Sequence, residues 1–293
     1  MENLRYYDLI IQRESCRDFT DEEIEEEKLQ QISDGLSQCD PLDDSIATEF
    51  HIIDSAEAEK LKDTVGYNGF MIRAPKYALL FSEEKDHYLE NAAFIMQALT
   101  LKMTSLGLAA CWLTINDAEK AVSQLGIDTD KTLAVVVGFG YRNKEKKSTR
   151  LDIKSPSDVK VNKNSKRTAP KIALGEFVFE NRFGKEAPLD LLSRQYPQLN
   201  DALICMSVAQ SFFNRQPYRV ILTRNSVCLI GLDDEMTGEA DRHLNYGIEM
   251  FNFYAVNERT RGEGDSLKKW TFDAPEEDLG LPQNAHFVAQ CRL

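Results

Sequence analysis

Residues 92–113 read AAFIMQALTLKMTSLGLAACWL and form the most apolar long stretch of this 293-residue chain. Apolar residues between Leu89 and Leu106 recur at alternating spacings of three and four, which is the period of an α-helix. The opposite side of this helix is apolar as well, which is typical of a helix inside a core or an interface. Gln97 and Lys102 argue against a membrane span, because a charge at mid-membrane is costly. We therefore expect a buried helix of a soluble protein here.

Shorter apolar runs on either side of this stretch predict strands. FHII at 50–53 and KYALLF at 76–81 have the length of buried strands, and TLAVVVGFGY at 132–141 predicts a central one. Thr20-Asp21-Glu22-Glu23 has the form of a capping box, which predicts a helix that begins there and carries Ile32 on its buried face.

The second part of the chain repeats this order. After a polar, Lys-rich stretch at 143–171, we expect a helix at about 199–213, strands at 219–223 and 227–231, a helix around 244–255 and a last strand within AHFVAQCRL. Helix, strand, strand, long apolar helix, strand thus occurs twice, which indicates a duplicated α+β unit. We predict a first half at 1–150, a basic connector at 151–175 and a second, diverged half at 176–293.

Composition excludes several classes of partner. The formal charge of −13 and the pI near 4.9 argue against nucleic acid and anionic membranes, which attract clustered Lys and Arg. The six cysteines include no C-x-x-C pair, and the opening MENLRYYDLI has no secretory pattern, so we expect a cytoplasmic protein.

Common catalytic signatures are absent from the sequence. The four histidines are far apart, and neither a G-x-S-x-G elbow nor a phosphate-binding G-x-x-x-x-G-K-[ST] loop occurs, so we predict no metal site and no catalytic side chain. GFGYRN at 138–143 begins like a dinucleotide fingerprint, but Asn143 stands where the third Gly belongs.

RESCRDFT at 13–20 carries the remaining chemistry. Alternate residues of an extended segment point to the same side, so Arg13, Ser15 and Arg17 could converge on one anion such as a phosphate. The alternative is that the two arginines lie on the surface and pair with the acidic helix that follows.

Several segments together resemble the flavin-dependent nitroreductase family. RESCRDFTDEEIEEEKLQQI resembles its opening R-x-S-x-[RK]-x-F segment and acidic helix, and four further segments follow in the family's order. They are IRAPKYALLF at 72–81, ENAAFIMQALTLKMTSLGLAACWL at 90–113, LAVVVGFGY at 133–141 and KRTAPKIALGEFV at 166–178. SFFNRQPYRVIL at 211–222 resembles the family's N-x-Q-P-[WY]-x-F motif.

These motifs are split between the halves. The first half reads SQCDPLDDSIATEF at 37–50, without the Asn and Gln of that motif, and the second half has only ENRFGK at 180–185 in place of R-x-S-x-R. Family members are usually homodimers with FMN at the subunit interface. The resemblance therefore implies an α+β, nitroreductase-like fold in which two tandem halves form an internal pseudo-dimer around one FMN site.

The resemblance also implies three groups of cofactor-binding residues. The phosphate group is Arg13, Ser15, Arg17 and Arg167, with Lys166 as a weaker candidate and Glu14 within the same segment. The ring group is Trp112, Leu113 and Thr114 near N5, with Asn68 at the pyrimidine edge. The loop from the second half is Gln210, Ser211, Phe212 and Asn214, whose shape Gln216-Pro217 would fix. Thr114-Ile115 stands where many members carry Glu-Gly, and Trp112 and Arg167 have the alternatives of core packing and a solvated linker.

The implied activity is that of an FMN-dependent oxidoreductase. NAD(P)H would be a transient co-substrate that gives hydride to flavin N5, and a nitro compound or quinone would receive it. The alternative is a non-catalytic flavin-binding storage, sensor or interaction protein; a flavin-free scaffold is a third. We expect a monomeric pseudo-dimer, with further self-association left open, and no nucleic-acid or membrane partner.

Overall fold

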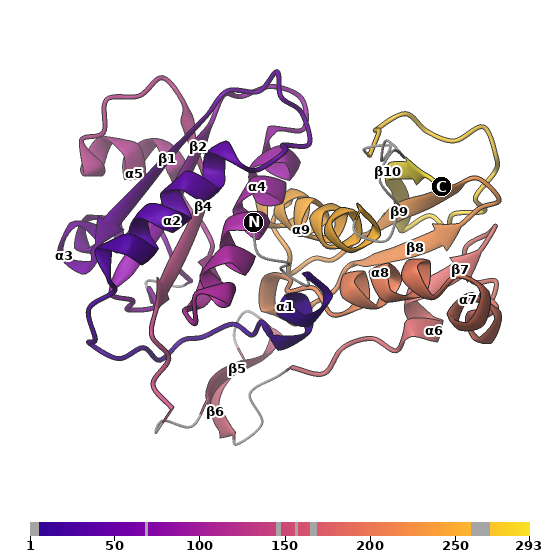
Figure 1. The fold of residues 1–293 in the computed structure, drawn as a ribbon, viewed down its shortest axis with the longest axis horizontal. Coiled ribbons are helices and arrows are strands. Elements are labelled where there is room, and N and C mark those ends of the chain that lie inside the picture. Colours follow the sequence, from indigo (N-terminus) through magenta and orange to yellow (C-terminus); the bar gives the residue numbers. More distant parts are fainter. Residues whose placement is uncertain (1–5, 68–69, 145–147, 156–157, 165–168, 259–269) are drawn as a thin grey trace. The chain divides into compact units, whose positions relative to one another are not determined.

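The computed structural model describes residues 6–67, 70–144, 148–155, 158–164, 169–258 and 270–293 (Figure 1). The chain divides into two compact units, one of Gln12–Ala169 and one of Met1–Ile11 with Pro170–Leu293. The change of unit at 169–170 falls within the stretch predicted as a connector. Each unit contains a four-stranded sheet.

The Gln12–Ala169 unit has the strand order β1-β2-β4-β3, and all neighbours are antiparallel. The strands are β1 (Thr48–Asp54), β2 (Lys76–Ser82), β3 (Ala109–Leu113) and β4 (Thr132–Gly140). Six consecutive residues of β2 and eight of β4 are buried, as expected for inner strands covered on both faces. The predicted strands at 50–53, 76–81 and 132–141 are confirmed.

Helices cover this sheet. Helix α4 (Tyr88–Ser105) packs on β2, β3 and β4 and also contacts α2 (Glu26–Ser37). Helix α3 (Ser55–Ala58), the 3₁₀ turn η1 (Glu59–Leu61) and α5 (Ala118–Leu125) form a second apolar cluster with strand residues that include Leu79, Phe81 and Val136. The presence of apolar residues all round α4 is thereby explained, because the helix is enclosed on several sides.

The helix predicted from the apolar period between Leu89 and Leu106 is confirmed. It ends at Ser105, because Gly107 adopts the left-handed conformation (φ 79°), and residues 109–113 of the apolar stretch enter the sheet as β3. One sequence-based boundary is wrong. The helix expected to begin at Thr20 begins at Glu26. The Thr20 N–H instead donates to the Tyr141 carbonyl (2.8 Å), which keeps residues 19–20 extended beside the end of β4.

The Pro170–Leu293 unit has the order β10-β9-β8-β7. Its strands are β7 (Val178–Glu180), β8 (Tyr218–Leu222), β9 (Ser226–Leu232) and β10 (Ala285–Arg292), and its helices are α6 (Leu174–Phe177), α7 (Leu189–Gln195), α8 (Pro197–Ser207) and α9 (Glu239–Glu258). The helix predicted at 199–213 ends at Ser207, and a separate 3₁₀ turn, η2 (Phe212–Asn214), follows. The other predicted elements of this half are confirmed.

The Lys-rich stretch contains two strands, although its polar composition predicted an extended connector. Strands β5 (Ser148–Ser155) and β6 (Asp158–Asn164) pair antiparallel, with Leu151 opposite Val161 and Ile153 opposite Val159. The stretch predicted as a polar connector therefore contains two strands, at 148–155 and 158–164, and in each of them alternate apolar residues recur with the period of a strand.

The two units share the topology of three strands, whereas their fourth strands differ: β3 pairs antiparallel with β4, and β7 pairs parallel with β8 at the opposite edge. Strands β8-β9-β10 match β1-β2-β4 in order and in antiparallel sense, and α9 precedes β10 as α4 precedes β3 and β4. An asparagine on each long helix also performs the same task. Asn91 Oδ1 accepts the Asp43 N–H (2.9 Å), and Asn245 Oδ1 accepts the Phe212 N–H (3.1 Å). The predicted duplication of an α+β unit is confirmed.

Helix α1 (Tyr6–Gln12) packs mainly with the second of these repeats. The Tyr6 ring lies edge-on to Phe251 of α9, with ring centroids 5.8 Å apart. The pKa of Tyr7 is raised, first by burial and then by the charges of Asp201 and other neighbouring groups. The start of the chain thus completes a unit whose remaining residues begin at Pro170.

A carboxyl group is enclosed in the core of the same unit. Glu249 of α9 is fully buried, and neither of its carboxyl oxygens has a hydrogen-bond partner within the described structure. The buried Tyr218 hydroxyl interacts with it electrostatically but lies outside hydrogen-bond geometry. Burial raises the pKa of Glu249 well above its usual value, and Tyr218 and Lys171 oppose this only in part.

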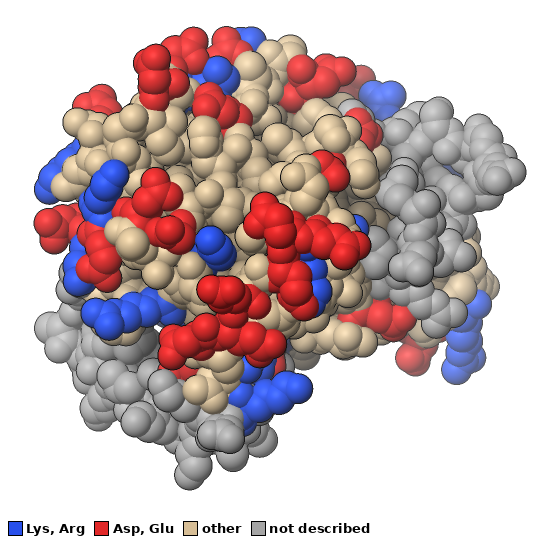
Figure 2. Space-filling view, turned by 60° about the vertical axis from the view of Figure 1, so that its left-hand side comes forward, with Lys and Arg blue, Asp and Glu red and all other residues tan. Residues whose placement is uncertain are grey.

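The surface agrees with the acidic composition. Figure 2 shows Asp and Glu side chains spread over the described part of one face, with Lys and Arg interspersed among them. Among the described helices, none combines the length and apolar character that a bilayer crossing needs.

Candidate functional site

The RESCR segment is held beside β3 as a short extra strand. Ser15 forms a parallel bridge with Ala110, and the Cys16 N–H donates to the Ala110 carbonyl (3.0 Å). Two residues later the chain pairs with the end of β4, through a bridge of Phe19 with Arg142 and a hydrogen bond from the Asn143 N–H to the Asp18 carbonyl (3.0 Å). This pairing holds Ser15 and residues 18–19 beside the sheet, and a common side for Arg13, Ser15 and Arg17 stays a prediction from their spacing.

The two arginines act on one buried thiol. Burial raises the pKa of Cys111, and the positive charges of Arg17 and Arg13 oppose this rise. Both guanidinium groups therefore lie within electrostatic range of the middle of β3. Arg17 is exposed and Arg13 and Ser15 are partly buried, so the segment can present two cations and a hydroxyl to a ligand.

Glu14 has a neighbour of its own. Its carboxylate pairs with Arg142 at 2.5 Å, and both side chains are about four-fifths buried. Direct contact between Glu14 and a cofactor stays a prediction. In the structure its evident task is to hold Arg142 at this position.

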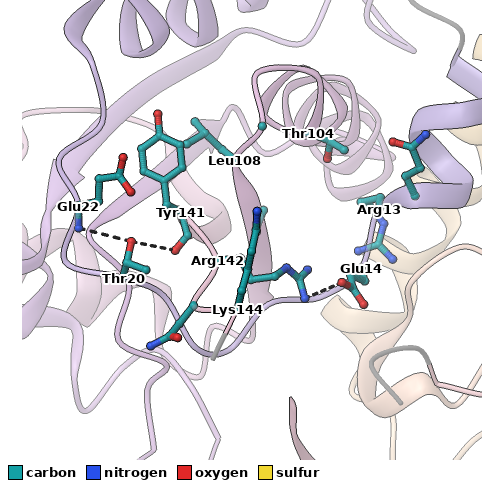
Figure 3. A pocket seen from close by; sticks show the side chains of 14 residues that line it. Arg13, Glu14, Thr20, Glu22, Thr104, Leu108, Tyr141, Arg142 and Lys144 are labelled. Atoms are coloured by element: carbon teal, nitrogen blue, oxygen red, sulfur yellow. Dashed lines mark hydrogen bonds and ion pairs between the residues drawn. The ribbon is translucent and has the colours of Figure 1, made fainter. Parts of the chain in front are cut away.

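A cleft of about 760 Å³ opens at the Arg13 end of the segment (Figure 3). Its walls come from the RESCR segment, the end of α4 with the turn that follows, the start of β3 and the residues after β4. Arg13, Arg142 and Lys144 contribute cations, Thr20, Thr104 and Tyr141 contribute hydroxyls, and Glu14 and Glu22 contribute carboxylates. All lining residues belong to the Gln12–Ala169 unit.

The predicted ring group lies at the far end of β3. The indole N–H of Trp112 is buried and has no acceptor in the described part of the chain, whereas Leu113 is buried as plain packing. The Thr114 carbonyl accepts the Gly66 N–H (2.8 Å). Asn68, Lys166 and Arg167 lie outside the described residues, so their predicted roles stay predictions.

The predicted loop of the second half is braced by its own polar groups. Ser211 Oγ accepts the Gln216 N–H (3.0 Å), and Asn214 Nδ2 donates to the Pro170 carbonyl (2.8 Å). Gln216 Oε1 accepts the Ile172 N–H (2.9 Å), and its Nε2 donates to the Asn214 carbonyl (3.0 Å). Gln216 thus fixes the loop's shape, as the sequence predicted.

The same loop stores backbone strain. Phe213, Asn214 and Gln216 all have positive φ angles, of 47°, 58° and 53°. Non-glycine residues in this region cluster at functional sites. Phe212 begins this strained turn and Gln210 lies two residues before it, and their contact with a cofactor stays a prediction.

The second half has no equivalent cation pair in its ENRFGK segment. Arg182 pairs with Asp278 (3.2 Å) and Lys185 pairs with Glu180 (2.7 Å), so both cations of this segment have carboxylate partners. The structure brings the 13–17 and 112–114 groups together in one unit and the 210–214 group into the other. That all three contact one flavin stays a prediction.

Sequence reasoning missed Tyr141 and Arg142. Their signal was available, because Tyr141 is the last residue of the predicted central strand and Arg142 follows it, and loops after strands often carry binding groups. The sequence interpretation considered GFGYRN only as a dinucleotide fingerprint, whereas the residues that line the cleft, Tyr141 and Arg142, follow its glycines.

The donor set fits a phosphate-bearing cofactor. Two arginines and a serine in one segment match the planar and hydroxyl donors that phosphates require, and the buried Trp112 N–H has no acceptor among the described residues. Among the described residues, no group of three His, Cys, Asp or Glu side chains could hold a metal ion.

Comparison with known proteins identifies the family of the chain. The model of the family described as "Putative TM nitroreductase" matches residues 5–254. A solved structure described as a "putative nitroreductase" from Thermotoga maritima MSB8 is similar over 100% of this chain and 94% of its own, with 14% identity and a TM-score of 0.56. An FMN-dependent nitroreductase from Clostridium difficile R20291 is 21% identical over 47% of this chain and 88% of its own, with a TM-score of 0.42. None of the curated proteins matches.

The structural match at 14% identity shows the fold, and the family match covers most of the sequence. The expected nitroreductase-like α+β fold is therefore confirmed, and the chain belongs to the TM nitroreductase family of oxidoreductases.

Proposed function

We propose that the chain is an FMN-dependent oxidoreductase that transfers hydride from NAD(P)H to a small electron-poor acceptor, such as a nitro compound or a quinone. Family membership supports a flavin oxidoreductase in general. The observation that carries the FMN assignment is the RESCR segment, which the Ser15–Ala110 bridge holds beside β3 with both arginines in electrostatic range of Cys111.

The residues of the Gln12–Ala169 unit would divide the work of binding. Arg13, Ser15 and Arg17 would hold the phosphate, through bidentate guanidinium contacts and a hydroxyl hydrogen bond. The Trp112–Thr114 segment would lie along the ring, and its position is fixed by the hydrogen bond from Gly66 to Thr114. Bound FMN supplies the hydride chemistry at N5, whereas these residues bind and orient the cofactor.

Titration of the apoprotein with FMN, followed by fluorescence quenching, tests the binding site. We expect one FMN per chain, and Arg17→Ala should weaken binding at least tenfold, because a hydrogen bond to a charged group contributes about 1.5–3 kcal/mol. Lys120→Ala is the matched control, since Lys120 is an exposed cation on α5 of the same unit. Absence of FMN binding, or equal loss in both variants, would refute the assignment.

Anaerobic reduction tests the catalytic part separately. NADPH or NADH should bleach the bound flavin, and a quinone should restore its colour, with ping-pong steady-state kinetics. Flavin that binds but resists reduction by either nicotinamide would contradict the enzyme and favour the non-catalytic flavin-binding alternative.

A further inference from the structure

The cleft next to Arg13 is larger than the flavin phosphate needs. Its volume of about 760 Å³ lies within the range of sites for whole small molecules. A phosphate held between Arg13, Ser15 and Arg17 would occupy the edge of this space. Most of the cleft therefore remains for another chemical group.

The cleft is cationic within an acidic chain. Arg13, Arg142 and Lys144 face two carboxylates, Glu14 and Glu22, which leaves a formal excess of one positive charge in a chain whose net charge is −13. Glu14 is engaged with Arg142 (2.5 Å), and Figure 3 shows the Arg142 side chain between Tyr141 on one side and Arg13 on the other. Such a wall favours an anion with several oxygens.

An aromatic side chain is fixed at the opposite wall. The Tyr141 hydroxyl is anchored by the Glu25 carboxylate and by Lys28 Nζ, both from the start of α2. These contacts restrain the Tyr141 ring where it lines the cleft. A restrained aromatic ring beside cations is a favourable surface for a nucleobase, whose π-face can stack on it.

The order of the predicted ring segment, the predicted phosphate position and the cleft along β3 narrows the class of ligand. Ser15 lies opposite Ala110, so the predicted phosphate position lies at the edge of the cleft (residues 108–110) that is nearer to the predicted ring segment at 112–114. The step from Ala109 to Leu113 is about 13 Å at 3.3 Å per residue. The cleft is thus on the side of the phosphate away from the flavin ring, at the distance of the remote half of a dinucleotide.

We propose that this cleft binds the adenylate half of a dinucleotide, with its phosphates on Arg13, Arg142 and Lys144 and its adenine against Tyr141. This inference rests on the proposed function for the identity of the neighbouring flavin site. Two dinucleotides contain this half, FAD as the cofactor and NAD(P)H as the co-substrate. The binding chemistry of the cleft is the same for both.

Binding of 5′-AMP to the flavin-free full chain, measured by equilibrium dialysis, tests the cleft itself. Lys144→Gln leaves the Glu14–Arg142 pair intact and Arg142→Gln removes it; each should weaken 5′-AMP binding about tenfold. Tyr141→Leu should weaken it as well, while Lys120→Gln is the matched surface control. Failure of 5′-AMP to bind, or equal loss in the control, overturns the proposal. Thermal melting of each variant verifies that it folds.

Two further measurements distinguish FAD from NAD(P)H as the dinucleotide that the cleft binds. If FAD is the source, the wild-type chain binds FAD about tenfold more tightly than FMN, and Lys144→Gln removes that advantage without changing FMN affinity. If NAD(P)H is the source, FMN and FAD bind equally, and Lys144→Gln raises KM for the nicotinamide in the FMN-loaded protein at unchanged kcat. In a chain that binds a flavin, a response in neither measurement overturns the proposal.

The results that would refute the proposed function differ from those that would refute the adenylate cleft. A chain that binds 5′-AMP but neither FMN nor FAD would refute the flavin assignment and leave the adenylate cleft standing. A chain whose bound FMN is reduced by NAD(P)H, but which does not bind 5′-AMP, would refute the cleft alone.

Discussion

Replacement of Glu249 by Gln should stabilise the unit that contains it, by an amount that grows with pH. In the unfolded chain a Glu carboxyl ionises above its usual pKa of 4.5, whereas burial keeps Glu249 protonated to a much higher pH. The stability that wild type has below pH 4.5 is therefore lost as pH rises toward the folded-state pKa. The amide introduced by Glu249→Gln cannot ionise, so the variant escapes this loss.

The slope can be worked out from the linkage relation. Each pH unit between the unfolded and the folded pKa costs the wild-type chain about 1.4 kcal/mol. With a folded-state pKa above 7, the stability difference in favour of the Glu249→Gln variant should therefore grow by about 2.7 kcal/mol between pH 5 and pH 7. With a lower folded-state pKa, the growth stops at that pH. Any fixed cost of burying an amide shifts all points equally and leaves the slope unchanged.

The assay can be restricted to the correct unit. The chain has two tryptophans, and Trp270 is buried beside α9, where its indole N–H donates to the Met250 carbonyl (3.0 Å). In a Trp112→Phe background, urea unfolding followed by fluorescence reports on Trp270. Glu239→Gln, at the exposed start of α9, is the matched control. A stability difference between wild type and Glu249→Gln that is independent of pH would refute the assignment of a buried, protonated carboxyl.

Three further predictions concern local structure in the first half and the thiols. Gly66→Ala should destabilise the Gln12–Ala169 unit by about 1–3 kcal/mol in urea unfolding, because φ is 111° and an added Cβ would clash with the Phe70 carbonyl oxygen; stability equal to wild type would contradict the described turn. Asp117→Ala should cost about 1 kcal/mol in the same assay, since Asp117 Oδ1 caps α5 by accepting the Lys120 N–H (3.0 Å); Asp128→Ala, which lies between α5 and β4, is the control and should have little effect. In native protein, a thiol reagent should modify Cys39 first because the other five cysteines are buried, and Cys39→Ser should remove this fast phase; a fast phase that persists would place another thiol at the surface.

The periodic elements could be predicted from the sequence, and their boundaries could not. The apolar stretch that contains α4 continues beyond Ser105, because residues 108–113 are apolar for a different reason, their place in the sheet. Thr20 has the composition of a helix cap, yet its N–H pairs with Tyr141, 121 residues away in the sequence. A contact of that range is invisible to local pattern, so tertiary pairing decided where both helices lie.

The candidate site shows the same division. The spacing of Arg13, Ser15 and Arg17 predicts a common side from an extended backbone alone, and that prediction needs no knowledge of the tertiary fold. The partnership of Glu14 with Arg142 could not be predicted, since it depends on the pairing of residues 15–20 with β3 and the end of β4. The cleft exists because of that pairing, and its residues come from four separate segments.

Helix α1 belongs to the unit that is otherwise formed by the other end of the sequence, and this affects the order of folding during synthesis. The ribosome makes residues 1–11 before Pro170–Leu293, which form the rest of the unit that residues 1–11 complete. Helix α1 therefore has no finished surface to join until the last strand has emerged, although domains usually fold in the order in which they are made. In a pair of separate subunits such an arrangement would depend on protein concentration, whereas here one chain supplies both parts, and the effective concentration of α1 is set by the intervening residues of Gln12–Ala169.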